Sequence, residues 1–517
     1  MRRSAEILMI GTRRALLFSG LQRYLVITIN LVMMAVVARW LSPKEVGVVL
    51  MANGLILLAD VLRDFGVSNY LIQALEITKE TARTAFTINL ILSLFLAGLL
   101  YGSSDLIASF YAEPRLVLVL RVVTTTVLFG SLSSPLYALL RRDMAFGTIF
   151  VITITATAAN FISFCSFIVL GFGYMSLAWA SLVFSLINTL LTLALRPYYW
   201  IFRPSLQGWR SVVSFGGCSI ATDLLRIFYS SLPQLVLGRV LDFSAVGLYS
   251  RATMLCQVPE RFVISGLVPV LLPALAAQVR GGGSLKASYL RGIGLMTAVQ
   301  WPSLMCMALL ADPIVQLLLG RQWLAVAPLV RIMAMASLAM FPAFLNYPVL
   351  VSLGRMKDIL ITNLVSLPPS GALVFVAAHI SLDAVAASMI LTGPFEVCVA
   401  LRFVRRRIFF TWSELFAATR KSAVVALCSA LPPAAAMTLS GFRSDMSLPL
   451  MFVTGAAAAL GWLAGLWITR HPLLAEEMRI AMQQIAPAVR SVLGHVPATV
   501  PQRAAANSPR AVDEPPG

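Results

Sequence analysis

Residues 15–65 read ALLFSGLQRYLVITINLVMMAVVARWLSPKEVGVVLMANGLILLADVLRDF. Two apolar runs flank a short Ser-Pro turn, and each is close to the roughly 20 residues with which a helix crosses the hydrocarbon core of a bilayer. The pattern continues along the chain of 517 residues, which is 59% hydrophobic and 12% charged. Soluble domains typically carry about a quarter charged residues. The composition therefore predicts an all-α polytopic membrane protein.

Apolar runs of this length recur from Ala15 to Ile468 and predict about fourteen transmembrane helices. The seventh run, Ser211–Leu237, and the eighth, Val246–Ala276, are the least regular because charged residues and prolines interrupt them. Every other run is apolar enough to be read directly as a span.

The basic residues predict the orientation of these helices. With the N-terminus in the cytoplasm, 28 of the 40 Lys and Arg residues fall on the cytoplasmic side and 8 on the opposite side. Cytoplasmic loops of membrane proteins carry such an excess. We therefore expect an even number of helices with both termini cytoplasmic. Topology also explains the net charge of +18, so we expect no nucleic-acid partner.

The chain contains an internal repeat. At an offset of 200 residues, Arg39 and Leu41 match Arg239 and Leu241, and Val46-Gly47 matches Val246-Gly247. A second echo, at an offset of 210, pairs Leu120-Arg121 with Val330-Arg331. Because six helices separate the copies, they predict two parallel six-helix halves, an arrangement typical of transporters, followed by two extra helices.

This division predicts five segments. They are a cytoplasmic N-terminus (1–14), a first half (15–203), a second half (204–407), a basic cytoplasmic loop with helices 13 and 14 (408–470), and a partly disordered cytoplasmic tail (471–517). The stretch Arg402–Lys421 holds six basic residues together with the aromatic residues Phe403, Phe409, Phe410 and Trp412, which is typical of a segment lying on anionic membrane lipid.

The sequence shows no pattern for a metal, a cofactor or catalysis. The six cysteines all fall in apolar runs without a CxxC pair, and the three histidines lie far apart along the chain. The loops on the outer side are short. We therefore expect no metal, no cofactor and no enzyme.

Charged residues inside the spans are the candidates for function, because a charge at the centre of a membrane helix costs about 2.5–3.5 kcal/mol on insertion scales. We predict a cationic cavity for an anionic substrate, formed by Arg23, Arg63, Arg226, Arg251 and Arg261. A coupling or charge-pairing role is predicted for Asp60, Asp223, Glu260 and Glu396. The alternative is that an arginine reaches the interface or pairs locally, as Asp223 and Arg226 could at a spacing of three.

Several short motifs occur in a recognisable order. They are Ala38-Arg39-Trp40-Leu41-Ser42-Pro43-Lys44-Glu45-Val46-Gly47, Asp64-Phe65-Gly66, the stretch Leu139–Phe146, the stretch Val246–Ala252, and Gly320-Arg321-Gln322-Trp323. Over roughly Ala15 to Arg407 the chain resembles polysaccharide-biosynthesis flippases of the Wzx/PST type, which belong to the multidrug/oligosaccharidyl-lipid/polysaccharide (MOP) exporter superfamily.

The resemblance implies a V-shaped, MATE-like bundle of two six-helix halves. It implies alternating access and movement of undecaprenyl-diphosphate-linked oligosaccharide across the bacterial inner membrane, for exopolysaccharide, capsule or O-antigen. Polysaccharide polymerase and export proteins are the further partners it suggests. Related lipid II flippases use arginines in the first, second and eighth helices, where Arg23, Arg63 and Arg251 lie here. Many family members carry an aspartate where this chain has Gln234.

Two other functions remain open. A drug or small-cation antiporter of the same superfamily should line its cavity with carboxylates, whereas here the arginines are at least as prominent. A membrane polysaccharide polymerase or ligase should have a large periplasmic loop, whereas these loops are short.

Overall fold

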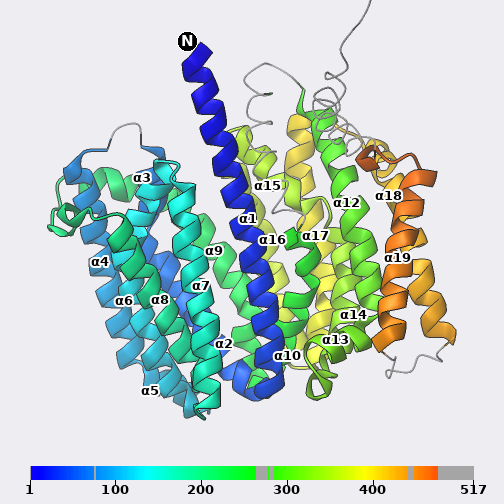
Figure 1. Cartoon of the computed structure of the whole chain (residues 1–517), viewed down its shortest axis with the longest axis horizontal. Helices are drawn as coiled ribbons and strands as arrows, with labels where there is room; N and C mark the ends of the chain where they lie inside the picture. Colours follow the sequence, from blue (N-terminus) through cyan, green and yellow to red (C-terminus); the bar gives the residue numbers. More distant parts are fainter. Residues whose placement is uncertain (1, 75–76, 263–277, 279–283, 440–447, 475–517) are drawn as a thin grey trace, which may run out of the picture.

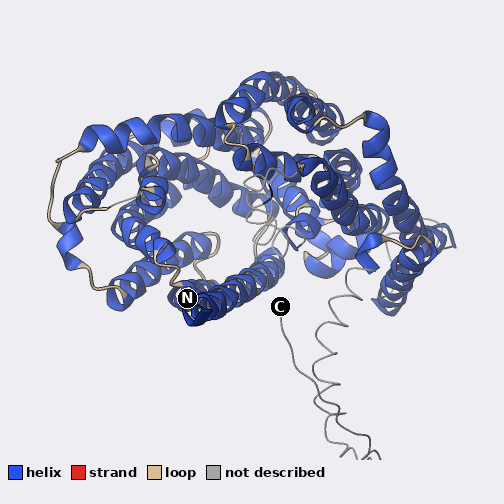
Figure 2. Ribbon diagram, turned by 90° about the horizontal axis from the view of Figure 1, so that it is seen from above, coloured by secondary structure: helices blue, strands red, loops and turns tan. Residues whose placement is uncertain are grey.

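The computed structural model of the chain describes residues 2–74, 77–262, 278, 284–439 and 448–474. Every regular element in these ranges is a helix, and Figure 2 looks down the bundle, where most helices are seen nearly end-on. Twelve of the described helices are long and apolar enough to cross a membrane. In lipid each backbone polar group must be satisfied internally, which a helix achieves within itself. The prediction of an all-α polytopic membrane protein is confirmed.

The first part of the bundle, residues 2–202, is built around six long helices. Its elements are α1 (Arg2–Trp40), α2 (Pro43–Asp64), α3 (Val67–Gln73), α4 (Lys79–Gly102), α5 (Ser104–Phe110), α6 (Arg115–Arg142), α7 (Phe146–Val169), α8 (Met175–Leu195) and the 3-10 helix η1 (Tyr199–Phe202).

The second part repeats this layout. Its elements are α9 (Trp209–Val240), α10 (Phe243–Cys256), α12 (Leu285–Leu309), α13 (Ala311–Leu318), η2 (Arg321–Trp323), α14 (Val326–Ser337), η3 (Leu338–Met340), α15 (Ala343–Ser352), α16 (Met356–Ala378) and α17 (Leu382–Ile408). The appended helices α18 (Trp412–Leu439) and α19 (Leu448–Ile468) follow. Figure 1 shows most of the first part on the left and most of the second part on the right, with α1 and α9 between them.

The predicted spans and the observed helices differ in detail. The seventh predicted span lies within α9, whereas the eighth begins in α10 and most of its remainder lies outside the described residues. The tenth, Ala325–Val351, is divided among α14, η3 and α15. The short helices α3, α5 and α13 were not predicted, because seven or eight residues are too few to span a bilayer.

The Ser-Pro turn between α1 and α2 is a capping box. The Ser42 hydroxyl accepts the Glu45 backbone N–H at 3.4 Å, and the Glu45 carboxylate accepts the Ser42 backbone N–H at 2.9 Å. At the repeated position, Asp242 caps α10 by accepting the Ala245 backbone N–H at 2.6 Å. Both halves therefore begin their second long helix with a side-chain cap.

The two halves meet where α2 and α10 begin, at the bottom of Figure 1. An added Cβ at Gly47 would lie 1.8 Å from the Phe243 carbonyl oxygen, and one at Gly247 would lie 2.1 Å from the Pro43 carbonyl oxygen. The two contacts are related by the 200-residue repeat. We call this reciprocal contact of Pro43, Gly47, Phe243 and Gly247 the seam, and this end of the bundle the seam end. Glycine is required because backbone lies directly on backbone.

Side chains flank the seam. The Trp323 indole N–H donates to the Ala38 carbonyl at 2.7 Å, and Arg39 Nη2 donates to the Leu317 carbonyl at 2.9 Å. These bonds join the last turn of α1 to α13 and to η2. They tie the first half to the second at the same end as the glycines.

A repeated ion pair supports the second sequence echo. Arg121 on α6 pairs with Asp105 on α5 at 2.8 Å, and Arg331 on α14 pairs with Asp312 on α13. The matched arginines thus play the same part in both halves, each holding a short helix against the long helix that follows it. This is structural evidence for the parallel repeat.

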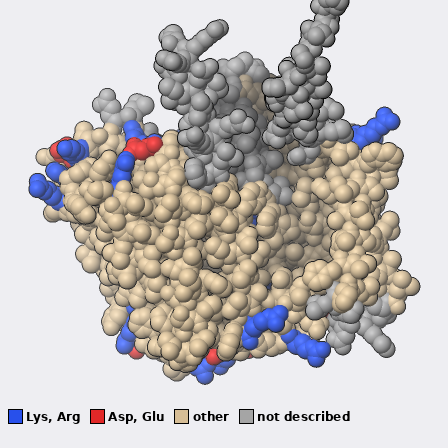
Figure 3. Space-filling view, viewed as in Figure 1, with Lys and Arg blue, Asp and Glu red and all other residues tan. Residues whose placement is uncertain are grey.

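We call the opposite end of the bundle, where α1 begins and α6 and α8 finish, the basic end. Arg141, Arg142 and Arg196 lie there. Figure 3 shows Lys and Arg side chains along the two edges of the visible face, with a broad uncharged band between them. Such a band is the surface that faces lipid.

The appended helices pack on the second half through α12. Thr297 of α12 donates to the Ser422 hydroxyl at 2.8 Å, and Ser422 donates to the Gly294 carbonyl at 2.9 Å. The predicted tail, 471–517, lies outside the described residues beyond position 474. The five predicted segment boundaries stay predictions.

Candidate functional site

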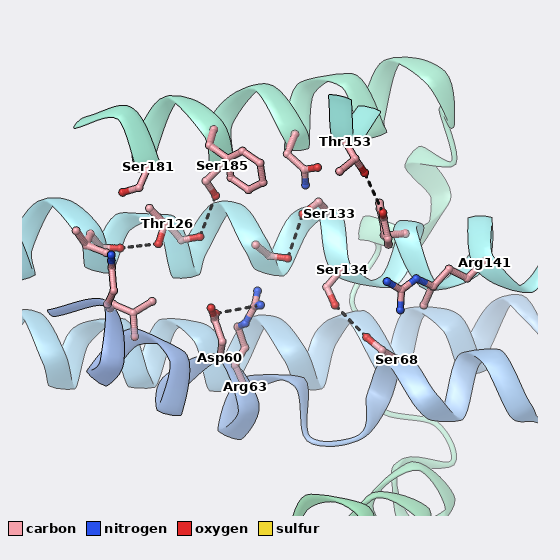
Figure 4. A pocket seen from close by; sticks show the side chains of 18 of the residues that line it. Asp60, Arg63, Ser68, Thr126, Ser133, Ser134, Arg141, Thr153, Ser181 and Ser185 are labelled. Carbon is pink, nitrogen blue, oxygen red and sulfur yellow. Dashed lines mark hydrogen bonds and ion pairs between the residues drawn. The ribbon is translucent and has the colours of Figure 1, made fainter. Parts of the chain in front are cut away.

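A polar pocket lies inside the first half, between α2, α3, α6, α7 and α8 (Figure 4). Its volume of about 530 Å³ is within the range of small-molecule sites. Its polar lining comprises Asn53, Asp60, Arg63, Ser68, Thr126, Ser133, Ser134, Tyr137, Arg141, Thr153, Ser181, Ser185 and Asn188. We call it the Arg63 pocket. So many polar groups inside an apolar bundle mark it as the candidate site.

Arg63 occupies the wall formed by α2. Its side chain is buried, its Nη2 lies 3.1 Å from Asp60 Oδ1, and its Nη1 donates to the Val127 carbonyl of α6 at 3.3 Å. The planar guanidinium can satisfy both acceptors at once because its donors form a rigid fork. The charge of Arg63 is therefore compensated inside the protein.

Gly130 of α6 provides the space for this guanidinium. A Cβ at position 130 would lie 2.5 Å from Arg63 Nη1 and 3.0 Å from Arg63 Cζ. Any larger residue would displace the arginine from its two partners. The position of Arg63 thus depends on a glycine 67 residues further along the chain.

The wall formed by α8 consists of hydroxyl and amide groups. Ser181, Ser185 and Asn188 are spaced four and three residues apart, which places them on one face of the helix. Ser181 donates to the Ala178 carbonyl at 2.7 Å, and Ser185 donates to the Thr126 carbonyl of α6 at 3.2 Å. Figure 4 shows both serines facing the pocket from the side opposite Asp60 and Arg63.

One end of the pocket lies at the basic end, where α6 finishes, and we call this end the mouth. The Arg141 guanidinium is exposed there and lies over the Tyr137 ring, 5.1 Å from its centroid. The Tyr137 hydroxyl and the Thr153 hydroxyl are 3.2 Å apart. The pocket therefore runs from this basic mouth to a neutral, hydroxyl-lined interior.

Arg251 lies in α10, outside this pocket. Its side chain is only 8% exposed, its guanidinium lies over the Trp323 ring at 5.8 Å from the centroid, and its Nη1 is 3.8 Å from the sulfur of Met254. Within the part of the chain that the structure describes, no carboxylate pairs with it and its Nε has no hydrogen-bond partner. A buried charge without a partner is costly, which points to a role other than stability.

The other predicted arginines are exposed. Arg226 pairs with Asp223 at 3.6 Å, at the predicted spacing of three, and Arg261 donates to Gln257 at 2.8 Å. Arg23 is exposed on α1. Of the five predicted arginines, only Arg63 lines the pocket.

The predicted carboxylates lie at separate places. Asp60 is in the pocket, whereas Glu260 follows α10 and is half-buried. Glu396 lies on α17. The structure thus brings together Asp60 with Arg63 and Asp223 with Arg226, and it keeps the two glutamates apart from both pairs.

Sequence reasoning missed most of the pocket. It did not identify Arg141, Tyr137, Asn53 or Asn188, because it searched for charges at mid-span. A signal was present, since the polar residues of α8 recur at helical spacing along one face of an apolar helix.

Residues 36–328, more than half of the chain, match the family model described as Polysaccharide biosynthesis protein. The chain belongs to this family. The motifs on which the sequence resemblance rested lie within the matched range or at its edges, and the predicted family is confirmed.

Curated proteins resemble the chain over much of its length. The lipopolysaccharide biosynthesis protein WzxC of Escherichia coli (strain K12) is 24% identical over 327 residues, covering 62% of this chain and 66% of that protein. The succinoglycan biosynthesis transport protein ExoT of Rhizobium meliloti (strain 1021) is 23% identical, covering 63% and 66%. The alignments thus span just under two thirds of these relatives.

Solved structures show the same fold. The lipid II flippase MurJ in an inward closed conformation superposes with a TM-score of 0.69, at 12% identity, over 90% of this chain and 99% of that one. An inward-facing MATE family transporter of the MOP superfamily superposes with a TM-score of 0.59, at 17% identity, over 75% and 98%. The predicted MATE-like architecture is confirmed.

Proposed function

We propose that this member of the polysaccharide biosynthesis family is a flippase for polyprenyl-diphosphate-linked oligosaccharide. It would act in the bacterial inner membrane, in the synthesis of exopolysaccharide, capsule or O-antigen. The names of its curated relatives and the fold it shares with a lipid II flippase support this. In this proposal the chain transports its substrate and does not modify it.

The observation that carries the proposal is the Arg63 pocket, which reaches the basic end of a bundle whose two halves are joined at the other end. Sugars and a diphosphate cannot cross hydrocarbon unaided, because their polar groups would lose water without gaining partners. A polar pocket that reaches one end of the bundle, while the seam is closed at the other end, accommodates such a head group. The polyprenyl chain meanwhile remains in lipid.

We infer that the basic end faces the cytoplasm, since basic loops are retained there. Transport then requires the seam to open while the basic end closes, which is alternating access between two parallel halves. Arg251, now covered by Trp323, would meet the substrate when the seam opens. In the same proposal the diphosphate contacts Arg23, Arg226 and Arg261 on its way, and Asp60, Asp223, Glu260 and Glu396 balance or couple charge. Polysaccharide polymerase and export proteins would act on the flipped product.

Deletion of the gene in its host tests the proposal. We expect loss of the surface polymer and accumulation of its lipid-linked oligosaccharide in the inner membrane, both restored by the wild-type gene. Arg251→Ala and Arg23→Ala should restore neither. Unchanged polymer and lipid-linked oligosaccharide in the deletion strain would refute the proposal. New drug sensitivity would indicate an antiporter instead, and polymerisation by the purified protein would indicate an enzyme.

A further inference from the structure

We propose that the interior of the Arg63 pocket is a subsite for the sugar hydroxyls of the substrate and that its mouth, at Arg141, takes the diphosphate. This assignment rests on the proposed function and adds which chemical part of the substrate goes where. Hydrogen-bond direction and charge compensation within the pocket carry it.

The interior presents oxygen acceptors. Thr126 donates its hydroxyl hydrogen to the Val123 carbonyl at 2.6 Å, and Ser181 and Ser185 also donate to backbone carbonyls. A hydroxyl whose hydrogen is engaged still has a lone pair to offer. These three groups therefore accept from a ligand that donates. A sugar hydroxyl donates, whereas a fully ionised phosphate only accepts.

Two amides complement this surface. Asn53 of α2 and Asn188 of α8 line the same pocket, and neither makes a side-chain hydrogen bond within the described ranges. Each primary amide provides donors and an acceptor on one planar group. Two neighbouring hydroxyl groups of a sugar can bind such an amide together, one accepting from the amide nitrogen and the other donating to the amide oxygen.

Electrostatics separate the interior from the mouth. Arg63 pairs with Asp60 and donates to the Val127 carbonyl, while its Nε is buried without a partner among the described residues. A diphosphate entering the interior would compete with these contacts and would meet the Asp60 carboxylate. Arg141 is exposed at the mouth, and its guanidinium contacts the Tyr137 ring. A guanidinium in this position can form charge-assisted hydrogen bonds to phosphate oxygens.

The arrangement also matches the order of groups in a lipid-linked sugar. The diphosphate joins the polyprenyl chain to the first sugar, so anchoring it at the mouth leaves the sugars free to enter. Phe184 adds an apolar surface to the interior, and sites of this kind combine apolar walls with a few placed polar groups.

Binding to the full-length purified protein tests the assignment with two probes. One is the lipid-linked oligosaccharide extracted from the deletion strain, and the other is undecaprenyl diphosphate. We expect Asn188→Leu and Ser185→Leu each to weaken binding of the lipid-linked oligosaccharide about tenfold, the effect of losing one or two hydrogen bonds. Undecaprenyl diphosphate should bind these variants as it binds the wild type. Arg141→Ala should weaken the binding of both probes by a similar factor.

Ser166→Leu is the matched control. Ser166 on α7 donates to the Ile162 carbonyl of its own helix at 3.0 Å and is exposed outside the Arg63 pocket. It should bind both probes like the wild type. The assignment is overturned if Asn188→Leu weakens the binding of both probes equally. It is also overturned if the wild type binds the lipid-linked oligosaccharide and Asn188→Leu binds both probes as tightly as the wild type does. If the wild type binds neither probe, the proposed function fails and the assignment falls with it.

Discussion

The seam and the Arg63 pocket lie towards opposite ends of the bundle and are formed by different kinds of groups. At the seam, backbone meets backbone through Gly47 and Gly247, and a single methyl group would not fit. In the pocket, hydroxyl groups, amide groups and the Asp60–Arg63 ion pair surround open space. A contact made by glycines and backbone can separate without leaving buried side-chain polar groups unpaired, whereas the pocket holds Asp60 and Arg63 together and leaves the amides of Asn53 and Asn188 without partners among the described residues. The comparison suggests that the seam is the part that moves and the pocket the part that recognises.

The largest effect is expected at the seam. Gly47→Ala or Gly247→Ala places a Cβ against a carbonyl oxygen of the other half, and no rotamer can relieve the overlap. We expect a loss of about 1–3 kcal/mol in stability, the usual cost of overpacking, and loss of polymer export. Thermal unfolding of the purified protein and complementation of the deletion strain measure the two effects. Gly98→Ala, which meets open space, is the control. Seam variants that behave like Gly98→Ala would show that the close contact is dispensable.

Arg251→Met should separate stability from transport. The substitution removes a buried charge that no carboxylate compensates among the described residues, so we expect Tm to stay level or rise. Export should fall by about tenfold or more, because the charge is retained for the substrate rather than for the fold. Arg251→Lys keeps the charge without the planar fork and should give intermediate export. A lower Tm together with normal export would assign Arg251 a purely structural role.

Gly130→Ala tests the pocket without removing any polar group. The added methyl would lie 2.5 Å from Arg63 Nη1 and would force the guanidinium away from Asp60. We expect a several-fold loss of export with the protein still folded, measured as polymer per cell and as Tm. Gly147→Ala on α7, where nothing lies within 4 Å, should leave export unchanged. Equal export from the two variants would argue against a role for the Asp60–Arg63 geometry.

The smallest effect concerns neither region but the joint of the appended helices. His471 is buried, its Nδ1 accepts the Leu473 backbone N–H at 3.2 Å, and its Nε2 lies 3.2 Å from the Ser422 hydroxyl. This arrangement suits the neutral ring, and burial, with the nearby Lys421, lowers the pKa of His471. Its contribution to stability is therefore complete above the unfolded pKa of about 6.5 and declines as the pH falls towards the folded pKa.

Tm measured at about pH 7.5 and about pH 5.5 checks this prediction. The wild type should lose more stability on acidification than His471→Gln, since glutamine does not titrate. Equal losses in the two proteins would show that His471 does not contribute to the pH dependence.

Much of the fold could be predicted from the sequence. Apolar runs of span length become helices because lipid offers no partner for an unpaired backbone group. The repeat at an offset of 200 also identified Gly47 and Gly247 as equivalent, and the structure places them in reciprocal contacts. The short helices escaped prediction because their length carries no hydropathy signal.

The candidate site was less predictable. Asp60 and Arg63 could be paired from their spacing, but Gly130, which makes room for the arginine, could not. The hydroxyl face of α8 was visible in the sequence as a helical period. The hydroxyl face of α8 lies opposite α2 across the pocket because of the way α2, α6 and α8 pack together, which the sequence does not show.

The sequence by itself determined that the chain is a membrane bundle, that its helices repeat in parallel, and that charges within it are few. These properties follow from partitioning into lipid and from hydrogen bonds between residues four apart, and both are local. The tertiary structure decided that Arg63 is compensated and Arg251 is not, and that two glycines 200 residues apart rest on each other's helices. Such contacts join helices distant in sequence, and no local pattern of residues specifies which faces will meet.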